Sequence, residues 1–360
     1  MNIIRRQWLR SIPPVATTAR VTTMITMTTV AAVAAFAALA SLAAPAAAEQ
    51  GELRIAKQYG LGYLTLMVME DQKLIEKRVK EAGIPDIKLT WATFRSSDVM
   101  NDGLLSSSVD FVCLGITGLG TIWAKTKGTP SEVRAVSGLN ALPLQLNTRS
   151  ASIKGIKDFT EKDKIALPAV KVSMQATLLQ MWAEKELGAA NRNKLDSLTV
   201  SMTHPDGMAA LISGAGEVNN HFTSPPFAQF ETEKPGVRKV ITSTEILGGP
   251  MSFNVIATTS KFYNENPKLV AVFMKALQDA TDFINRDKRG AAETYLRMTN
   301  GKQPVEELLA TLNAPGIEYT LVPQNILPFV DFSYRAGSIK TKPASWKELF
   351  FPVAYGWSGS

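Results

Sequence analysis

The sequence LLSSSVDF at residues 104–111 leads into GIT at 115–117, and this pattern decides the fold that we expect. A related run, LISGAGEV at 211–218, leads into FTS at 222–224 after a constant offset of 107 residues. Each run is typical of a helix end, a turn of small residues, an acid that opens a strand and a hydroxyl residue beyond it. Chance matching of small residues is the alternative. The repetition predicts two similar α/β lobes, each with a polar loop at the carboxyl edge of its sheet, where open α/β sheets bind ligands.

The apolar periodicity around the first run predicts alternating strands and helices. Residues 53–56, 87–93 and 109–114 have strand patterns, while residues 70–82, ended by Gly83, and the stretch around 99–105 have helical spacing. This β-α-β-α-β order indicates a mostly parallel sheet covered by helices. Further helices are predicted at 176–187, ended by Gly188, at 269–284 after Asn266-Pro267, and at 302–312.

The first 48 residues have the layout of an export signal. Four arginines precede an apolar run at 30–44, and Ala46-Ala47-Ala48 supplies small residues for cleavage near Glu49. The apolar run is shorter than the ~20 residues that span a bilayer, which favours a cleaved signal over a membrane anchor. Residues 5–10, RRQWLR, also fit a twin-arginine motif, so twin-arginine export and ordinary secretion both stay open. We expect a periplasmic protein that is not membrane-embedded after cleavage.

The charge of the remaining chain argues against a nucleic-acid partner. The sequence contains 39 Lys and Arg against 32 Asp and Glu, and four of these arginines, Arg5, Arg6, Arg10 and Arg20, lie in the export signal. The other 312 residues therefore carry a net charge of only +3, without the concentrated basic face of a nucleic-acid-binding protein. Their number suits about two domains.

The residues available for catalysis are few. The chain has two histidines, His204 and His221, and one cysteine, Cys113, and it contains no G-x-S-x-G, H-E-x-x-H or P-loop motif. Cys113 lies within the strand at 109–114, so we expect a buried core residue. His204 precedes Pro205, which favours a capping role in a turn. The sequence predicts a binding protein rather than an enzyme, with no cofactor and no metal site.

Glycines, neutral polar groups and aromatic residues gather beyond the expected strand ends and at helix starts. They have the character of a mostly apolar small-molecule site with a few neutral donors, although turn and capping roles are the alternative for each residue. The glycines at 115–120 are expected to let the backbone approach a ligand closely. No arginine lies in these loops; the nearest are Arg95 and Arg149. The candidate ligand-binding residues are Gly62, Tyr63, Gly115, Ile116, Thr117, Asn140, Ser173, Met174, Gln175, His221, Phe222, Thr223, Ser224 and Phe253.

The order of several motifs resembles one family of transport proteins. The segments are LTLMVME at 64–70 before LIEK at 74–77, GLL at 103–105 before VDF and LG, and IKDF at 156–159 before KIAL. Together they are similar to periplasmic solute-binding proteins of ABC importers, in the nitrate, sulfonate and taurine group that includes thiamine-pyrimidine-precursor binders. Two segments depart from the family pattern. Ser106-Ser107-Ser108 replaces the usual Gly-Glu, and HFTSPP at 221–226 is not a pattern that identifies one ligand.

The resemblance implies a two-lobed periplasmic-binding-protein-like fold of type II. Two mixed, mostly parallel sheets would be flanked by helices, with the ligand cleft between the lobes. Lobe 1 is expected at 49–139 plus 250–360 and lobe 2 at 140–249, with hinge crossings near 137–143 and 247–251.

The implied function is reversible capture of a small solute, either a sulfonate-, nitrate- or taurine-like anion or a small heterocycle. A monomer would deliver this solute to an ABC permease with its ATPase subunit. The alternatives are a ligand-binding sensor or adaptor, and a pyrimidine-precursor enzyme on the same fold.

Overall fold

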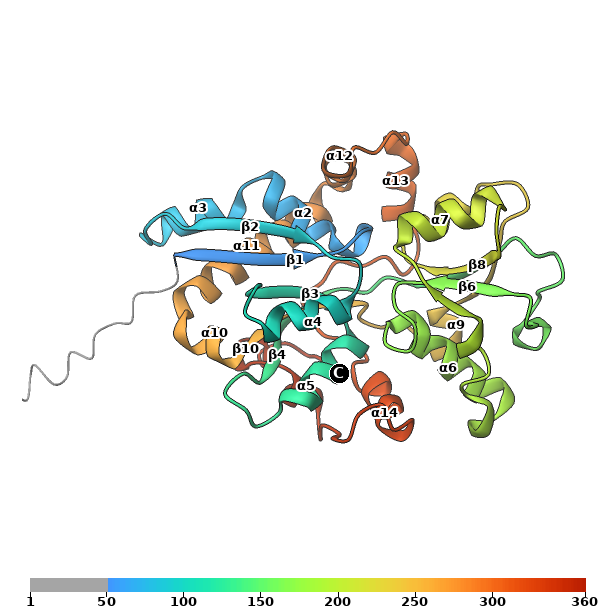
Figure 1. The fold of residues 1–360 in the computed structure, drawn as a ribbon. Coiled ribbons are helices and arrows are strands. Elements are labelled where there is room, and N and C mark those ends of the chain that lie inside the picture. Colours follow the sequence, from blue (N-terminus) through green and yellow to red (C-terminus); the bar gives the residue numbers. More distant parts are fainter. Residues whose placement is uncertain (1–50) are drawn as a thin grey trace, which may run out of the picture. The chain divides into compact units, whose positions relative to one another are not determined.

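A computed structural model describes residues 51–360, which form two five-stranded sheets (Figure 1). The predicted export signal lies outside the described residues. The first sheet has the order β2-β1-β3-β10-β4. Its strands are β1 (Glu52–Lys57), β2 (Lys88–Thr93), β3 (Phe111–Gly115), β4 (Val133–Asn140) and β10 (Asn254–Thr259).

The second sheet repeats this arrangement with the order β7-β6-β8-β5-β9. In each sheet two strand pairs are parallel and two are antiparallel, because β10 and β5 run against their neighbours. Four of the five strands in each sheet run in the same direction, so the two sheets are mixed and mostly parallel, as predicted. The strands of the second sheet are β5 (Gln145–Thr148), β6 (Lys164–Leu167), β7 (Thr199–Ser201), β8 (Val218–Thr223) and β9 (Arg238–Thr242).

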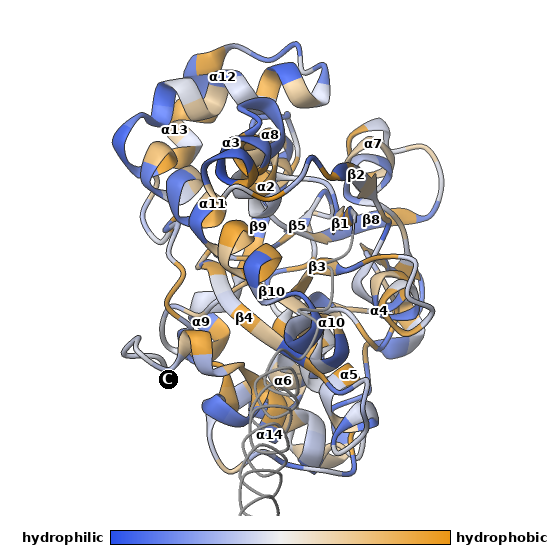
Figure 2. Ribbon diagram, turned by 90° about the vertical axis from the view of Figure 1, so that its left-hand side faces the viewer, coloured by the Kyte–Doolittle hydropathy of each residue, from blue (hydrophilic) through white to orange (hydrophobic). Residues whose placement is uncertain are grey.

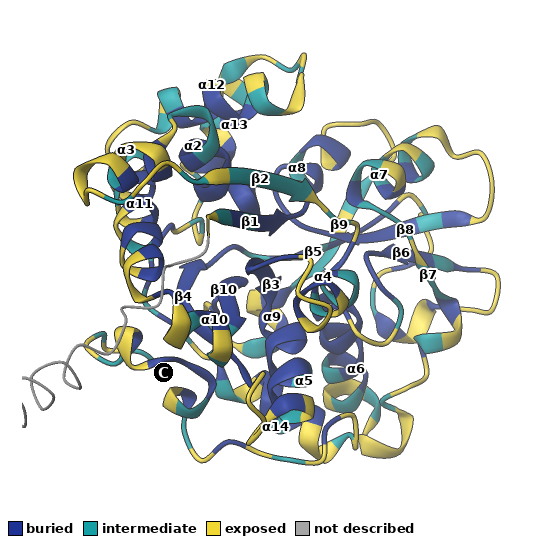
Figure 3. Ribbon diagram, turned by 60° about the vertical axis from the view of Figure 1, so that its left-hand side comes forward, coloured by how far each residue is buried: buried dark blue, intermediate teal, exposed yellow. Residues whose placement is uncertain are grey.

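The sequence repeat corresponds to the central strand of each sheet. Helix α4 (Ser97–Leu105) leads into β3, and helix α7 (His204–Ser213) leads into β8 at the equivalent position. Figure 3 shows both central strands largely buried, whereas exposed residues gather in loops and on outer helix faces. The repeat thus predicted the correct strands, although β3 begins at Phe111 rather than at 109.

Helices cover both faces of the first sheet, and the alternation of β3 shows how. Phe111 and Cys113 pack with α2, α3 and α11 on one face, while Val112 and Leu114 pack with α4 and α5 on the other. Figure 2 colours β3 and much of β4 as hydrophobic, as expected for strands buried on both faces. The helices associated with this sheet are α2 (Leu64–Asp71), α3 (Leu74–Glu81), α5 (Ile116–Thr126), α10 (Ser260–Glu265), α11 (Pro267–Arg286), α12 (Lys288–Thr299), α13 (Val305–Leu312) and α14 (Leu327–Arg335).

The second sheet is packed by shorter helices and by one long helix, α6. Ser173 caps α6, which begins at Met174 rather than at 176, and Gly188, at φ 85°, ends it, as the sequence predicted. Leu178, Leu179 and Trp182 supply the buried face of α6. The helices here are α6 (Met174–Leu187), α7, α8 (Phe227–Thr232) and α9 (Ser243–Leu247).

The helices differ from the predictions in several places. The single helix expected at 70–82 is two helices, α2 and α3, separated by Lys73 in the left-handed conformation at φ 53°. The glycine-rich stretch from Gly115 begins helix α5 rather than a loop. Helix α12 was not predicted, because its buried residues are mostly small and give a weak apolar pattern.

Two short segments carry the chain between the sheets. Residues 141–144 join β4 to β5, and residues 248–253 join α9 to β10. The C-terminal segment lies against both: Glu318 exchanges backbone hydrogen bonds with Ala141, and the Ser252 amide donates to the Gln324 carbonyl at 2.9 Å. The proposed lobe boundaries remain a prediction. No helix among residues 51–360 is long and apolar enough to cross a membrane.

Candidate ligand site between the two sheets

A small cavity of about 20 Å³ lies where the carboxyl edges of the two sheets meet. Gln58, Tyr63 and Ser97 follow β1 and β2, whereas Pro168 and Gln175 follow β6. Residues from both sheets therefore face one cavity, which we call the inner pocket. Its lining consists of Gln58, Tyr63, Ser97, Gly115, Pro168, Ser173, Met174, Gln175, His204, Phe253 and Asn254.

The two edges touch around the inner pocket. The Leu61 amide, beyond β1, donates to the Pro225 carbonyl beyond β8 at 2.9 Å. Gly115 at the end of β3 faces Met174 so closely that an added Cβ would lie 2.8 Å from the Met174 sulfur. A side chain at residue 115 would force Met174 to move, so glycine favours this close approach between the two sheets.

Two buried asparagines converge on the Gly62 carbonyl: Asn254 lines the inner pocket, and Asn140 lies beside it. The Nδ2 groups of Asn140 and Asn254 both donate to the Gly62 carbonyl, at 2.7 and 3.0 Å. Both side chains are fully buried, and their Oδ1 atoms accept no hydrogen bond from any residue within 51–360. Because a buried unpaired oxygen costs free energy, these atoms are suited to a donor on a ligand or to an ordered water.

Tyr63 supplies a buried hydroxyl to the same region. Burial raises the pKa of Tyr63 well above its usual value, so the phenol stays protonated. The side chain also lies within hydrogen-bonding reach of the Asn254 side chain. This part of the pocket consequently presents neutral groups.

The start of α6 forms the opposite wall of the inner pocket. Ser173 Oγ accepts the Ala176 amide at 3.2 Å, so this side chain caps its own helix while it lines the cavity. Met174 and Gln175 follow in the first turn, where the backbone amides have no partners inside the helix and carry partial positive charge.

His204 does not have the capping role that the sequence predicted. Thr203 caps α7 by accepting the Asp206 amide, and His204 is the first residue of that helix, buried and lining the inner pocket. Its Nδ1 lies 3.2 Å from His221 Nε2 and 3.1 Å from Thr223 Oγ1. Burial, reinforced by His221, lowers the pKa of His204 well below its usual value, so the ring is neutral.

A wider pocket of about 410 Å³ adjoins the inner one through Pro168, which lines both. The exposed guanidinium-bearing residue Arg95 of the first sheet lines it, opposite Thr203 and Asp206 of α7. Arg95 thus lies in the pocket that adjoins the candidate site, whereas Arg149 donates to the Leu211 carbonyl near the end of α7.

The candidate residues named from sequence fall into three groups. Tyr63, Gly115, Ser173, Met174, Gln175 and Phe253 line the inner pocket. Gly62 and Asn140 bond to each other beside it, His221 and Thr223 contact His204, and Ser224 packs near Gly60 of the first sheet. Ile116, Thr117 and Phe222 are buried in the fold outside that lining.

Sequence reasoning missed Gln58, Ser97, Pro168, His204 and Asn254. Gln58 directly follows β1, so the strand-end rule that selected Tyr63 could have selected it. Asn254 is the first residue of the antiparallel strand β10, so the amino end of this strand lies at the same sheet edge. The strand-end rule considers only residues that follow a strand and therefore does not select Asn254.

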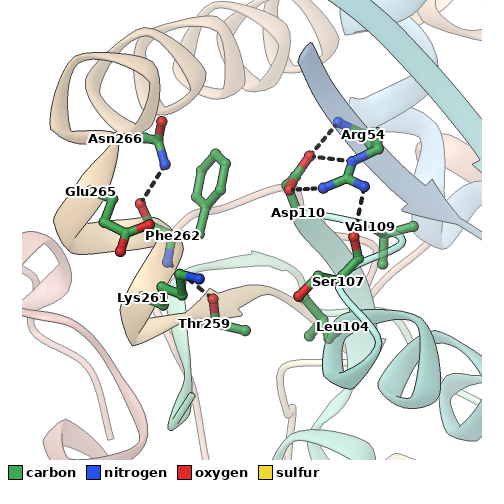
Figure 4. Close-up of a pocket in the computed structure, with 10 residues that line it drawn as sticks. All are labelled: Arg54, Leu104, Ser107, Val109, Asp110, Thr259, Lys261, Phe262, Glu265 and Asn266. Atoms are coloured by element: carbon green, nitrogen blue, oxygen red, sulfur yellow. Dashed lines mark hydrogen bonds and ion pairs between the residues drawn. The ribbon is translucent and has the colours of Figure 1, made fainter. Parts of the chain in front are cut away.

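A third pocket lies at the opposite edge of the first sheet (Figure 4). Its volume is about 160 Å³, and it lies near the start of β1 and β3 and the end of β10. Its guanidinium, on Arg54, is bonded to both carboxylate oxygens of Asp110 and to the Ser107 carbonyl. Because the Arg54 guanidinium is already paired, this pocket is a weaker candidate for a ligand site than the inner pocket.

Other chemistry within the described chain is limited. Cys113 is fully buried in β3 and burial raises its pKa, which confirms the predicted core role. Residues 51–360 contain no cluster of three or more His, Cys, Asp or Glu side chains arranged to hold a metal ion.

The comparison with known families assigns the chain to a protein family. A model of the NMT1-like family matches residues 46–298. The chain belongs to the NMT1-like family. No curated protein sequence shows significant similarity to this member of the family.

Solved structures share the fold of this NMT1-like protein at low sequence identity. The alkanesulfonate-binding protein SsuA from Xanthomonas axonopodis pv. citri, bound to MOPS, is 18% identical, with a TM-score of 0.64 over 86% of this chain and 98% of that chain. The periplasmic aliphatic sulphonate binding protein SsuA from Escherichia coli is 17% identical (TM-score 0.61; 84% and 92%). The periplasmic nitrate-binding protein NrtA from Synechocystis PCC 6803 is 15% identical (TM-score 0.61; 83% and 84%). The fold is therefore that of periplasmic binding proteins.

Proposed function

We propose that the protein is the extracytoplasmic solute-binding component of an ABC importer. The observation that carries this proposal is the inner pocket, which both sheets line and where buried Asn254 Oδ1 lacks a hydrogen-bond donor among residues 51–360. The shared fold with sulfonate- and nitrate-binding proteins supports it. We propose a small solute with an anionic group for the first turn of α6 and an N–H or O–H group for Asn254.

Capture of such a solute requires the two sheets to move apart and close again. A cavity of about 20 Å³ has room for about one water molecule, which is smaller than any sulfonate. Segments 141–144 and 248–253 are the proposed hinge between the proposed lobes. Contacts with both lobes would favour the closed state by the difference in ligand affinity between the two states. No bond is made or broken in this cycle.

A thermal-shift screen of the chain without its first 48 residues tests the proposal, with nitrate, ethanesulfonate, taurine and small heterocycles as ligands. At a hundredfold excess over Kd, a true ligand raises the free energy of unfolding by about 2.7 kcal/mol and therefore raises Tm. Gln175→Ala should reduce this shift, whereas Gln278→Ala, on the exposed face of α11, should not. A panel without any shift, or an equal shift in both variants, contradicts the proposed site.

The proposed partners are a membrane permease and its ATPase subunit. Genes for both beside this one would support import. A gene for a membrane-bound signalling protein in their place would instead favour the sensor or adaptor that the sequence left open.

A further inference from the structure

A chain of buried polar side chains runs from the interior of the second sheet to the inner pocket. Glu231 Oε1 of α8 lies 2.5 Å from His221 Nδ1, and His221 Nε2 lies 3.2 Å from His204 Nδ1. His204 Nε2 lies 3.3 Å from Gln175 Nε2, and both residues line the pocket. Glu231 and His221 are fully buried, and Asn147 Nδ2 donates to the second Glu231 oxygen at 2.8 Å. The carboxylate is thereby connected to the ligand site through two imidazole rings.

The charged groups of the surrounding elements leave Glu231 as the charge that acts on these rings. Asp206 of α7 is exposed and accepts the Thr203 hydroxyl at 2.6 Å, and Glu233 at the end of α8 is exposed. Lys164 begins β6 at the sheet edge away from the pocket, and β5 contains no titratable residue. On β9, Arg238 donates to the Ser150 carbonyl and Lys239 pairs with Glu245. Across the pocket, Tyr63 is protonated and Arg95 lies in the wider outer pocket. The charged residues of α6, Glu184, Lys185 and Glu186, lie in its C-terminal part.

Two proton arrangements satisfy the contacts among Glu231, His221 and His204, and the second also requires the Gln175 amide to turn so that its oxygen faces His204 Nε2. In the first, both rings are neutral: His221 Nδ1–H donates to Glu231, His204 Nδ1–H donates to His221 Nε2, and His204 Nε2 presents a lone pair, as its contact with the Gln175 amide nitrogen requires. In the second, one proton enters at His204 Nε2 while the Nδ1 proton of His204 passes to His221 Nε2. His221 then carries the positive charge beside Glu231, and His204 stays neutral but presents an N–H to the pocket. Thr223 Oγ1 can accept from or donate to His204 Nδ1 and so fits both.

We propose that His204 determines which ligand chemistry the inner pocket accepts, and that Glu231, acting through His221, is the positioning residue that sets the donor or acceptor state of His204 Nε2. The identity of the pocket as a ligand site rests on the proposed function, whereas the coupling between the rings does not. An anionic ligand selects the N–H arrangement, so its binding takes up one proton. Because ligand and proton favour each other, anion affinity rises as pH falls, by at most tenfold per pH unit. A neutral donor ligand has the opposite dependence.

The first experiment needs no ligand and no variant. The sequence contains only two histidines, so a ¹⁵N-histidine-labelled sample gives two sets of ring signals in a long-range ¹H–¹⁵N NMR spectrum. Between pH 8.5 and 5, we expect His204 to change from the Nδ1–H to the Nε2–H tautomer without becoming doubly protonated. A His204 ring that keeps one tautomer over this range, or that becomes doubly protonated itself, overturns the proposal.

The second experiment tests Glu231 with ethanesulfonate as the ligand. In the parent protein, calorimetry in buffers of different ionisation enthalpy should show uptake of up to one proton on binding at pH 7. Glu231→Gln removes the charge that stabilises the protonated His221, so affinity at pH 5.5 should fall tenfold or more, while affinities at pH 8.5 should agree. Glu233→Gln, an exposed neighbour on the same helix, should behave as the parent.

The two proposals fail in different ways. A parent protein that binds ethanesulfonate without proton uptake, or a Glu231→Gln variant with an unchanged pH profile, overturns the proposed coupling of Glu231 through His221 to His204, which we call the relay. Either result leaves the proposed solute-binding function standing. Failure of every anion to bind contradicts the proposed ligand class, and the tautomers measured in the free protein still decide the relay. The same measurement decides it if Glu231→Gln does not fold.

Discussion

Gly207 lies directly against the His221 ring. A Cβ at this position would lie 2.6 Å from His221 Nε2, and that ring is fully buried between Glu231 and His204. The absence of a side chain at residue 207 is therefore what allows α7 to pack on β8 at this distance.

We predict that Gly207→Ala destabilises the protein although alanine is the better helix former. Helix propensity alone would stabilise α7 by up to about 1 kcal/mol, whereas overpacking a buried site costs about 1–3 kcal/mol. Urea denaturation should show a lower midpoint. Ala209→Gly, at an exposed position of the same helix, calibrates the propensity difference. A Gly207→Ala protein as stable as the parent would show that the His221 ring has room to move.

His204 should make stability depend on pH. Burial first, and His221 second, hold the pKa of His204 well below its usual 6.5, so the unfolded chain binds a proton below that pH that the folded ring does not. The free energy of unfolding should therefore fall as the pH is lowered below 6.5, by up to about 1.4 kcal/mol per pH unit from this ring. In His204→Gln, denaturation curves between pH 7 and 5 should show a shallower decline. Equal slopes in both proteins would contradict a neutral His204 in the folded state.

The residue that caps helix α6 has two roles. Ser173 accepts the Ala176 amide as a cap and also lines the inner pocket, so a substitution that keeps the cap can still change the site. Aspartate caps helices about as well as serine but adds a negative charge.

We predict that Ser173→Asp leaves stability nearly unchanged and lowers the affinity for an anion by tenfold or more, equivalent to about 1.4 kcal/mol. The new carboxylate would occupy the first amides of α6 and repel the ligand. Ser173→Asn, a neutral cap, separates charge from shape. Calorimetry with ethanesulfonate measures the affinities, and an unchanged Ser173→Asp affinity would remove this helix start from the site.

The same elements show what sequence patterns can and cannot predict. The apolar run of β3 and the end of α6 at Gly188 follow from local composition, and both were predicted. Helix α5 was missed because Gly118 and Gly120 read as loop residues, whereas they allow close packing on Ser97 and Val330. That reason lies in distant parts of the chain, so no local pattern contains it.

The candidate site divides in the same way. Tyr63, Ser173 and Gln175 follow parallel strands of the sheets and were selected from that position. Asn254 and His204 reach the pocket through the antiparallel strand β10 and through the packing of α7 on β8. Their roles depend on contacts with residues 62 and 221, which only the folded structure brings near.

Motion of the whole molecule would be concentrated in residues 141–144 and 248–253. Gly248 ends α9 in the left-handed conformation at φ 79°, whereas an added Cβ at Gly249 would meet no atom within 4 Å. Outside these two segments, Arg335 of α14, a helix of the first sheet, forms an ion pair of 2.6 Å with Glu184 of α6, a helix of the second sheet. A substitution at 249 should therefore change the freedom of the hinge without disturbing either sheet.

We predict that Gly249→Val reduces the compaction that ligand binding produces, because a β-branched residue restricts the backbone of this segment. Small-angle scattering with and without ethanesulfonate should show a decrease in radius of gyration in the parent and a smaller one in the variant. Circular dichroism should confirm that both are folded. Equal compaction would place the hinge elsewhere.

The position of β10 also determines the order in which the protein can assemble. All five strands of the second sheet lie within residues 145–242, but β4 joins the first sheet only through β10, which ends at Thr259. Until that strand arrives, β3 keeps an apolar edge without a partner, a template for pairing with other chains. The second sheet can thus form from one continuous stretch, whereas the first must wait for a distant strand, which slows folding and lengthens the exposure to aggregation.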